Sequence, residues 1–316
     1  MYLNFRSVGD MSKVILSNLS QFPHDIDLVV GIPRSGMLPA NLIALYLNKP
    51  FTDIDSFAQG RIYASGDRGA FIDMGKSQKV LVVDDSINSG SALNRAKNKL
   101  HDFAASNPNI KLLFGAVYAT SASKNLVDIY CEILDGLRIF EWNLFHHPVI
   151  IPHSIFDIDG VLCPNPPVDD DGEKYLAYIS EAPMLYKPTV KIDKLVSCRL
   201  EKYREVTEKW LAKNNVKYNE LIMLPFNTKE ERVKWGRHGF YKGEVYKKSD
   251  DLLFVESSLR EAKQIFSVCK KPIFCTENFE MINDESFSNT RLPEIKIKLY
   301  KTLPYRVLSK LWHTVK

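Results

Sequence analysis

Two apolar runs that each end in a pair of carboxylates place the strongest constraint on how this chain folds. The first run, residues 80–83, is followed by Asp84 and Asp85 and then by a loop of small residues. A second run of the same kind leads into Asp157 and Asp159. A short β-branched run that ends in polar residues and precedes a helical segment is typical of a parallel sheet with crossover helices. We therefore expect α/β units with polar residues at the carboxyl ends of strands.

The pattern of strands and helices continues along the chain and divides it into two parts. With 316 residues the chain is long enough for two domains that each bury a core of their own. Strands are predicted at residues 27–32, 79–84, 111–118, 154–157, 195–197, 221–224, 252–256 and 272–275, and helices at 37–47, 91–105 and 200–214. We expect two Rossmann-like three-layer α/β domains, each with a mainly parallel sheet, over residues 1–150 and 151–316.

Composition and charge exclude several classes of protein. The formal net charge of +4 is small for this length and does not favour nucleic acid as a partner. The five cysteines show no CxxC or Cys/His spacing, so they are expected to be free thiols in a reducing cytoplasm. No apolar stretch has the length or the flanks of a signal peptide or a membrane span. A cytoplasmic protein is expected.

The C-terminal tail, residues 291–316, is basic and has apolar residues at helical spacing. Such a helix would contact a partner such as a glycosyltransferase, or would lie on a membrane surface and make the protein peripheral to the inner membrane. Packing of its apolar face on the second domain is the favoured alternative.

The first pair of carboxylates belongs to a pattern that suits a sugar phosphate. Asp84 and Asp85 can accept hydrogen bonds from neighbouring ribose hydroxyls, while backbone amides of residues 86–91 at a helix N-terminus can bind a phosphate. A second strand-to-helix turn, residues 31–36, contains Arg34, whose guanidinium suits a pyrophosphate. The alternative is that both segments are ordinary turns that only cap helices.

These two segments resemble the signature loops of type I phosphoribosyltransferases, over roughly residues 1–130. The resemblance implies phosphoribosyl pyrophosphate (PRPP) as a substrate, with Mg²⁺ beside the pyrophosphate and a mobile hood over the reaction, here residues 55–75. The implied PRPP-binding residues are Arg34, Ser35, Gly36, Arg61, Arg68, Asp84, Asp85, Ser86, Asn88, Ser89, Gly90 and Ser91. For Arg61 and Arg68, ordinary solvated side chains are an equal alternative.

The second pair of carboxylates suits the chemistry of phosphate removal. Asp157 can attack phosphorus, and Asp159 can protonate the leaving oxygen. From about residue 151 to at least residue 275 the chain resembles haloacid dehalogenase-like (HAD) phosphatases. The resemblance implies Asp157 as nucleophile, Asp159 as acid/base, Ser197 as the phosphoryl-binding hydroxyl and Lys242, favoured over Lys247, as the lysine.

The resemblance also implies a Mg²⁺ site formed by Asp157, Asp159 and Glu256. This chain departs from the family at Glu256-Ser257-Ser258, where two acids are usual. An inactive, structural HAD-like domain is the alternative. The segment that would form a cap, residues 162–187, is short and suits a phosphate at the end of a bulky molecule.

Together the two patterns predict a bifunctional enzyme of bacterial surface-polysaccharide synthesis. It would transfer ribose 5-phosphate from PRPP to a saccharide acceptor and then remove the 5-phosphate as a phosphomonoesterase. Pairing nucleotide synthesis with dephosphorylation would be futile, which disfavours a nucleobase acceptor. The alternatives are an orotate-type phosphoribosyltransferase with a fused phosphatase or regulatory domain, and a PRPP-sensing regulator.

Overall fold

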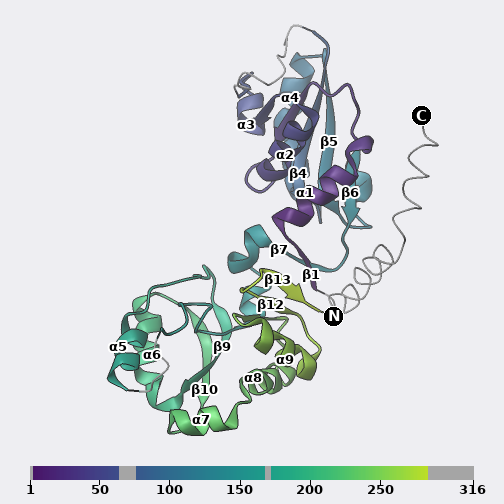
Figure 1. The fold of residues 1–316 in the computed structure, drawn as a ribbon. Helices are drawn as coiled ribbons and strands as arrows, with labels where there is room; N and C mark the ends of the chain where they lie inside the picture. Colours follow the sequence, from purple (N-terminus) through teal and green to yellow (C-terminus); the bar gives the residue numbers. More distant parts are fainter. Residues whose placement is uncertain (1–2, 64–75, 168–171, 284–316) are drawn as a thin grey trace, which may run out of the picture. The chain divides into compact units, whose positions relative to one another are not determined.

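A computed structural model describes residues 3–63, 76–167 and 172–283 of the chain. The chain divides into two compact units, Met1–Asn143 (unit 1) and Leu144–Lys316 (unit 2), coloured purple to teal and teal to yellow in Figure 1. The boundary expected from the sequence lies near residue 150. The two units are described separately below.

Unit 1 is built on a five-stranded sheet in the order β3–β2–β4–β5–β6, with every pair of neighbours parallel. The strands of this sheet are β2 (Leu28–Gly31), β3 (Phe51–Asp53), β4 (Gln78–Ser86), β5 (Ile110–Ala119) and β6 (Ile129–Ile133). The helices between them are α2 (Met37–Leu47), α3 (Ile54–Phe57) and α4 (Ser91–Ser106). Before them comes α1 (Val8–Ser17). A separate parallel pair joins β1 (Leu3–Arg6) to β7 (Leu137–Phe140).

The alternation of side chains along the strands produces the three layers of unit 1. Val29 and Leu81 point to one face and are buried with residues of α1 and α2. Their neighbours Val30 and Val82 point to the other face and are buried with residues of α3 and α4. Because both faces are apolar, the central strands are continuous apolar runs, as expected for a parallel sheet covered on both sides.

Unit 2 contains a six-stranded sheet in the order β10–β9–β8–β11–β12–β13. All neighbours are parallel except β12 and β13. The elements are β8 (Ser154–Phe156), α5 (Glu173–Glu181), β9 (Ile192–Leu200), α6 (Arg204–Lys213), β10 (Tyr218–Leu224), α7 (Lys229–Trp235), α8 (His238–Lys247), β11 (Leu253–Glu256), α9 (Leu259–Cys269), β12 (Ile273–Cys275) and β13 (Glu280–Ile282).

Helices α8 and α9 cover one face of this second sheet. Ile155, Val196 and Phe254 from three adjacent strands form one core with Tyr246 of α8 and Ile265 of α9. Figure 1 shows α5 and α6 side by side, across β9 from α8 and α9. The central strand β8 lies between β9 and β11, so the carboxyl ends of these three strands meet at one edge.

The predicted α/β class with mainly parallel sheets is confirmed. The predicted helix at 37–47 has the bounds of α2, while the helix predicted at 200–214 begins with a 3-10 turn and becomes α6 at Arg204. The short strands β1, β3, β6, β7 and β13 were not predicted. No helix within the described residues is long and apolar enough to cross a membrane. The basic tail, residues 291–316, lies outside the described residues.

Candidate functional site

In unit 1 the loop between β2 and α2 lies directly against the end of β4. A Cβ atom added to Gly36 would lie 2.7 Å from the carbonyl oxygen of Val83 and 2.9 Å from the Cα of Asp84. Because real Cβ atoms do not approach backbone atoms so closely, this contact requires glycine. The loop that carries Arg34 and Ser35 is therefore held beside Asp84, with the Arg34 side chain exposed.

Asp84 and Asp85 lie at the end of β4 and are nearly removed from solvent, at 6% and 7% exposure. The amide of Asp85 donates to Oδ1 of Asp84 at 2.9 Å, and the hydroxyl of Ser35 donates to Oδ1 of Asp85 at 2.9 Å. Burial, and next the charge of Asp85, raise the pKa of Asp84 to about 8. Two loops and two carboxylates thus converge at the carboxyl edge of the sheet.

The loop after the carboxylates suits a phosphate group. Gly90 adopts a positive φ of 74°, and α4 begins at the next residue, Ser91, so amides of the first helical turn, which have no acceptor within the helix, lie at this loop. Asn88, Ser89 and Ser91 are exposed, while Ser86 is half-buried. The backbone of this segment is therefore open to a ligand.

The structure describes one of the two arginines expected in the hood. Arg61 is exposed, and its carbonyl accepts a hydrogen bond from Thr52 at 3.1 Å. Arg68 lies outside the described residues. The role of both in binding PRPP stays a prediction.

Two further residues reach this edge that were not anticipated from the sequence. Arg138 of β7 donates to the Ser86 hydroxyl at 2.9 Å and to the Ile87 carbonyl at 3.2 Å. The indole of Trp142 donates to Oδ2 of Asp85 at 2.8 Å. Trp142 lies in residues 139–151, which were expected to be a connector between the two domains, and Arg138 directly precedes them, so no signal except their polar and aromatic character pointed to these residues.

The raised pKa of Asp84 predicts how the stability of unit 1 depends on pH. Between the ordinary aspartate pKa near 4 and about 8, folded Asp84 holds a proton that the unfolded chain has lost, so stability falls as pH rises through this window. Asp84→Asn should remove this part of the decline. Thermal unfolding at several values from about pH 5 to about pH 9 measures it.

The matched control for this measurement is the exposed Asp102, whose change to Asn should leave the pH dependence as in the wild type. Equal declines in wild type and Asp84→Asn would contradict the raised pKa of Asp84.

In unit 2 a buried lysine joins three carboxylates. Nζ of Lys242 lies 2.7 Å from Asp157 Oδ2, 2.7 Å from Glu256 Oε2 and 2.9 Å from Glu261 Oε2. Burial would lower the pKa of Lys242, but Asp157 and Glu256 raise it well above its ordinary value. Lys247, the other candidate, is exposed in the last turn of the same helix. The structure thus brings Lys242, not Lys247, to Asp157.

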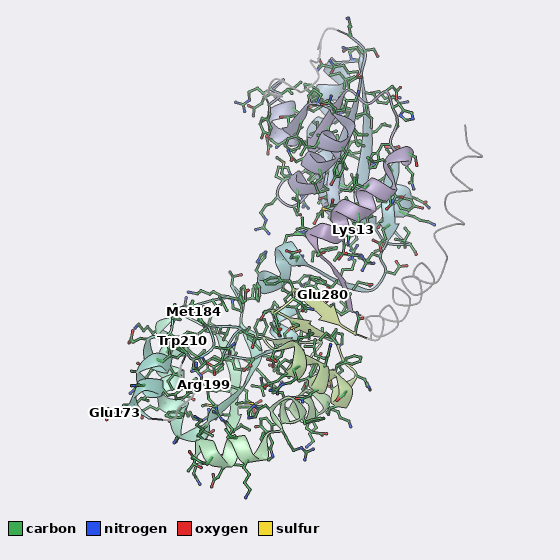
Figure 2. All side chains as sticks on the ribbon, in the orientation of Figure 1. Lys13, Glu173, Met184, Arg199, Trp210 and Glu280 are labelled. Atoms are coloured by element: carbon green, nitrogen blue, oxygen red, sulfur yellow. The ribbon has the colours of Figure 1, made fainter. Side chains whose placement is uncertain are left out.

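Asp159 is held by an arginine that the sequence analysis did not consider. Arg199 of β9, labelled in Figure 2, donates to the two carboxyl oxygens of Asp159 at 2.7 and 3.0 Å. Its side chain is fully buried and also contacts Thr207 at 3.3 Å and Cys163 at 3.3 Å. An arginine near the end of a strand, next to Leu200, was the available signal, because a buried charge needs a partner.

The predicted hydroxyl does not reach the cavity. Ser197 has no exposed surface and is absent from the cavity lining, whereas its neighbour Cys198 lines it. Successive residues of a strand point to opposite faces, so only one of the two can face the cavity. Burial raises the pKa of the Cys198 thiol, which keeps it protonated and a poor nucleophile.

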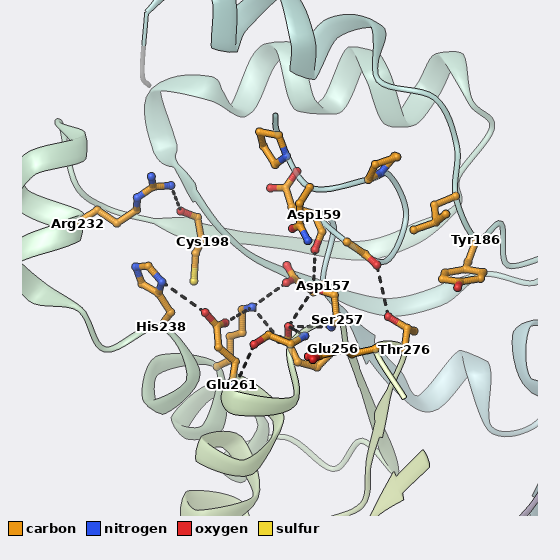
Figure 3. Close-up of a pocket in the computed structure, with 18 of the residues that line it drawn as sticks. Asp157, Asp159, Tyr186, Cys198, Arg232, His238, Glu256, Ser257, Glu261 and Thr276 are labelled. Atoms are coloured by element: carbon orange, nitrogen blue, oxygen red, sulfur yellow. Dashed lines mark hydrogen bonds and ion pairs between the residues drawn. The ribbon is translucent and has the colours of Figure 1, made fainter. Parts of the chain in front are cut away.

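The cavity around these residues has a volume of about 810 Å³ and opens at the carboxyl ends of β8, β9 and β11 (Figure 3). Two basic residues that were not predicted line it, Arg232 of α7 and His238 of α8. His238 lies 3.6 Å from Glu261. Burial alone would raise the pKa of Glu261, but the hydrogen bond with His238 and then the charge of Lys242 lower this pKa to about 2. His238 and Lys242 are four residues apart on α8, so they share a helix face.

The predicted Mg²⁺ ligands Asp157, Asp159 and Glu256 are not arranged as a metal site. Asp159 faces Arg199, and Lys242 lies between Asp157 and Glu256, in the position that a cation would take. Among the residues that the structure describes, no group of three or more His, Cys, Asp or Glu side chains is placed to hold a metal ion. This arrangement does not fit the predicted site.

The lysine cluster makes a prediction about stability that separates the two candidate lysines. Lys242→Met should leave Asp157 and Glu256 buried without their counter-charge and lower the stability by about 3–5 kcal/mol. Urea unfolding followed by the fluorescence of unit 2 measures the change. Lys247→Met, on the exposed side of the same helix, should unfold as the wild type does. Equal loss in both variants would contradict the cluster.

Comparison with known families agrees with the geometry of unit 1. Residues 3–151 match the family model described as the phosphoribosyl transferase domain. The match spans both loops, Asp84, Asp85 and the segment with Trp142. This part of the chain is therefore similar to phosphoribosyltransferase domains, and this similarity supports PRPP-dependent transferase activity.

Solved structures of phosphoribosyltransferases are similar to part of the chain. The xanthine-guanine-hypoxanthine enzyme of Helicobacter pylori is 16% identical over 45% of this chain and 93% of its own, with a TM-score of 0.34. The purine enzyme of Pyrococcus horikoshii is 15% identical over 45% and 94%, with a TM-score of 0.33. The orotate enzyme of Aeropyrum pernix is 15% identical over 36% and 58%, with a TM-score of 0.24. No curated protein matches the chain.

Proposed function

We propose that the chain is a bifunctional enzyme of bacterial surface-polysaccharide synthesis. Unit 1 would transfer ribose 5-phosphate from PRPP to a hydroxyl of a saccharide, and unit 2 would then hydrolyse the 5-phosphate. The observation that carries this proposal is the buried Asp157–Lys242 pair at an open cavity, in a chain whose other unit is similar to phosphoribosyltransferase domains.

In unit 1 the magnesium complex of PRPP is the substrate. The amides at the start of α4 suit its 5-phosphate, and the loop with Arg34 and Ser35 suits its pyrophosphate. Asp84 and Asp85 are the acceptors available for ribose hydroxyls. The acceptor oxygen forms a bond to C1 as the bond from C1 to pyrophosphate breaks. Attack from the opposite face inverts the α-linked donor and gives a β-ribofuranoside.

In unit 2 Asp157 would attack the phosphorus of the 5-phosphate as the bond from phosphorus to the ribose O5 breaks, and Asp159 would donate a proton to the leaving O5. The cation of Lys242, 2.7 Å from Asp157, opposes the build-up of negative charge around the phosphoryl group. Asp159, held by Arg199, would act on the water that hydrolyses the phosphorylated Asp157. Arg232 and His238 line the same cavity and suit the remaining phosphoryl oxygens.

The chemistry of the product favours a saccharide acceptor. A nucleotide made in unit 1 would be degraded to a nucleoside by a phosphatase in unit 2, and the PRPP would be wasted. A ribofuranosyl 5-phosphate on a glycan, in contrast, must lose its phosphate to become a plain ribofuranose. The cavity of about 810 Å³ is open enough to receive a phosphate at the end of a bulky molecule.

Asp157→Asn should stop the second reaction and leave the first intact. An amide is a poor nucleophile, so the phosphorylated ribosyl product should accumulate during incubation with PRPP, Mg²⁺ and acceptor. Mass spectrometry of the product distinguishes the two forms by the mass of one phosphate. Asp250→Asn, at an exposed acid of the same unit, is the matched control and should give the dephosphorylated product. Full dephosphorylation by Asp157→Asn would exclude Asp157 as the nucleophile.

The acceptor is tested by the release of pyrophosphate from PRPP. The wild type should release it with a panel of bacterial surface glycans and not with orotate, uracil, adenine, guanine or hypoxanthine. The double variant Asp84→Asn/Asp85→Asn is the background control. Rapid release with any one base would replace the glycan proposal by a nucleobase enzyme.

A further inference from the structure

Trp142 lies in the 3-10 turn Glu141–His146 that follows β7, and its orientation is fixed by a ladder of aromatic rings. Its ring stacks on Phe140 with centroids 4.7 Å apart and planes 7° apart. Phe140 in turn stacks on Tyr118, at 5.3 Å and 24°. Tyr118 is fully buried in β5, the strand next to β4. The ladder therefore anchors the indole to the core of unit 1 and fixes the direction of its N–H.

The indole N–H is directed at one of the two carboxylates of the PRPP loop. It donates to Oδ2 of Asp85 at 2.8 Å, while the hydroxyl of Ser35 donates to Oδ1 of the same carboxylate at 2.9 Å. Asp85 is thus held from both sides, by the loop between β2 and α2 and by the 3-10 turn that follows β7. Each of its oxygens retains a further lone pair for a ribose hydroxyl.

We propose that Trp142 is a positioning residue for PRPP, which sets the Asp85 carboxylate toward the ribose and couples it through Ser35 to the loop beside the pyrophosphate. The inference rests on the phosphoribosyl-transfer part of the proposed function. A carboxylate with only one fixed hydrogen bond rotates about its Cα–Cβ and Cβ–Cγ bonds, and ligand binding must then stop that rotation. Trp142 removes this cost before PRPP arrives.

Trp142→Phe isolates the hydrogen bond, because phenylalanine keeps the stacking on Phe140 and lacks the N–H donor. The dissociation constant of PRPP in the presence of Mg²⁺, measured by calorimetry, should rise about tenfold or more, as expected for the loss of a hydrogen bond to a charged group. A merely structural role would lower the thermal midpoint and leave the affinity unchanged.

Trp210→Phe is the matched control in unit 2. Its indole also donates a buried hydrogen bond, to the Ala182 carbonyl at 2.7 Å. This variant should lose stability and keep wild-type affinity for PRPP. Ser35→Ala removes the other hydrogen bond to Asp85 and should weaken PRPP binding as Trp142→Phe does, which keeps the test valid if the tryptophan variant does not fold.

Fluorescence supplies a second readout, because Trp142 is the one tryptophan in the sequence of residues 1–143. PRPP should change the emission of the wild type and of Trp210→Phe, and not that of Trp142→Phe. Wild-type affinity for PRPP in both Trp142→Phe and Ser35→Ala would overturn the inference. Absence of PRPP binding by the wild type would overturn the proposed function, and this inference with it.

Discussion

Burial of carboxylates at the ends of parallel strands is the constraint on which both units depend. A carboxylate taken out of water costs several kcal/mol unless charges or hydrogen bonds compensate it. In unit 1 the donors closest to Asp85 are neutral, the hydroxyl of Ser35 and the indole of Trp142. In unit 2 they are cations, Lys242 and Arg199. The first arrangement keeps a negative potential that suits hydroxyl groups, and the second provides positive charge where a phosphate would react.

The parts of the fold that the sequence predicts well are those set by local pattern. β4 and β5 are continuous apolar runs because both faces of the sheet are covered, and α2 ends where Asn48 takes a left-handed conformation. The strands β1 and β7 were missed because each has only four residues and its partner is distant in sequence, as in the pairing of Leu3 with Leu137. A local sequence pattern does not predict the pairing of two short strands so far apart in the sequence.

The residues of the two candidate sites also divide into those set by local sequence and those set by contacts distant in sequence. Residues at or just after the carboxyl end of a strand, such as Asp84 and Asp157, were found from the sequence, and the structure adds how they are held. Their chemical roles stay predictions. The choice between Ser197 and Cys198 depends on which face of β9 meets the cavity, which is a matter of three-dimensional register. Trp142 acts across a long sequence separation, so only the fold reveals its contact with Asp85.

The pairing of β1 with β7 has a consequence for how unit 1 is made. Asn4 donates to the backbone carbonyl of Asp135 at 2.6 Å, and Val8 donates to Glu141 at 2.8 Å, so the first and last segments of the unit close on each other. Because β1 pairs with β7, β1 can join its sheet only after β7 has been synthesised. Trp142, whose indole binds Asp85, directly follows β7 in the sequence and is made at almost the same time. The pairing that completes unit 1 and the contact that holds Asp85 therefore depend on the same stretch of chain, residues 137–142.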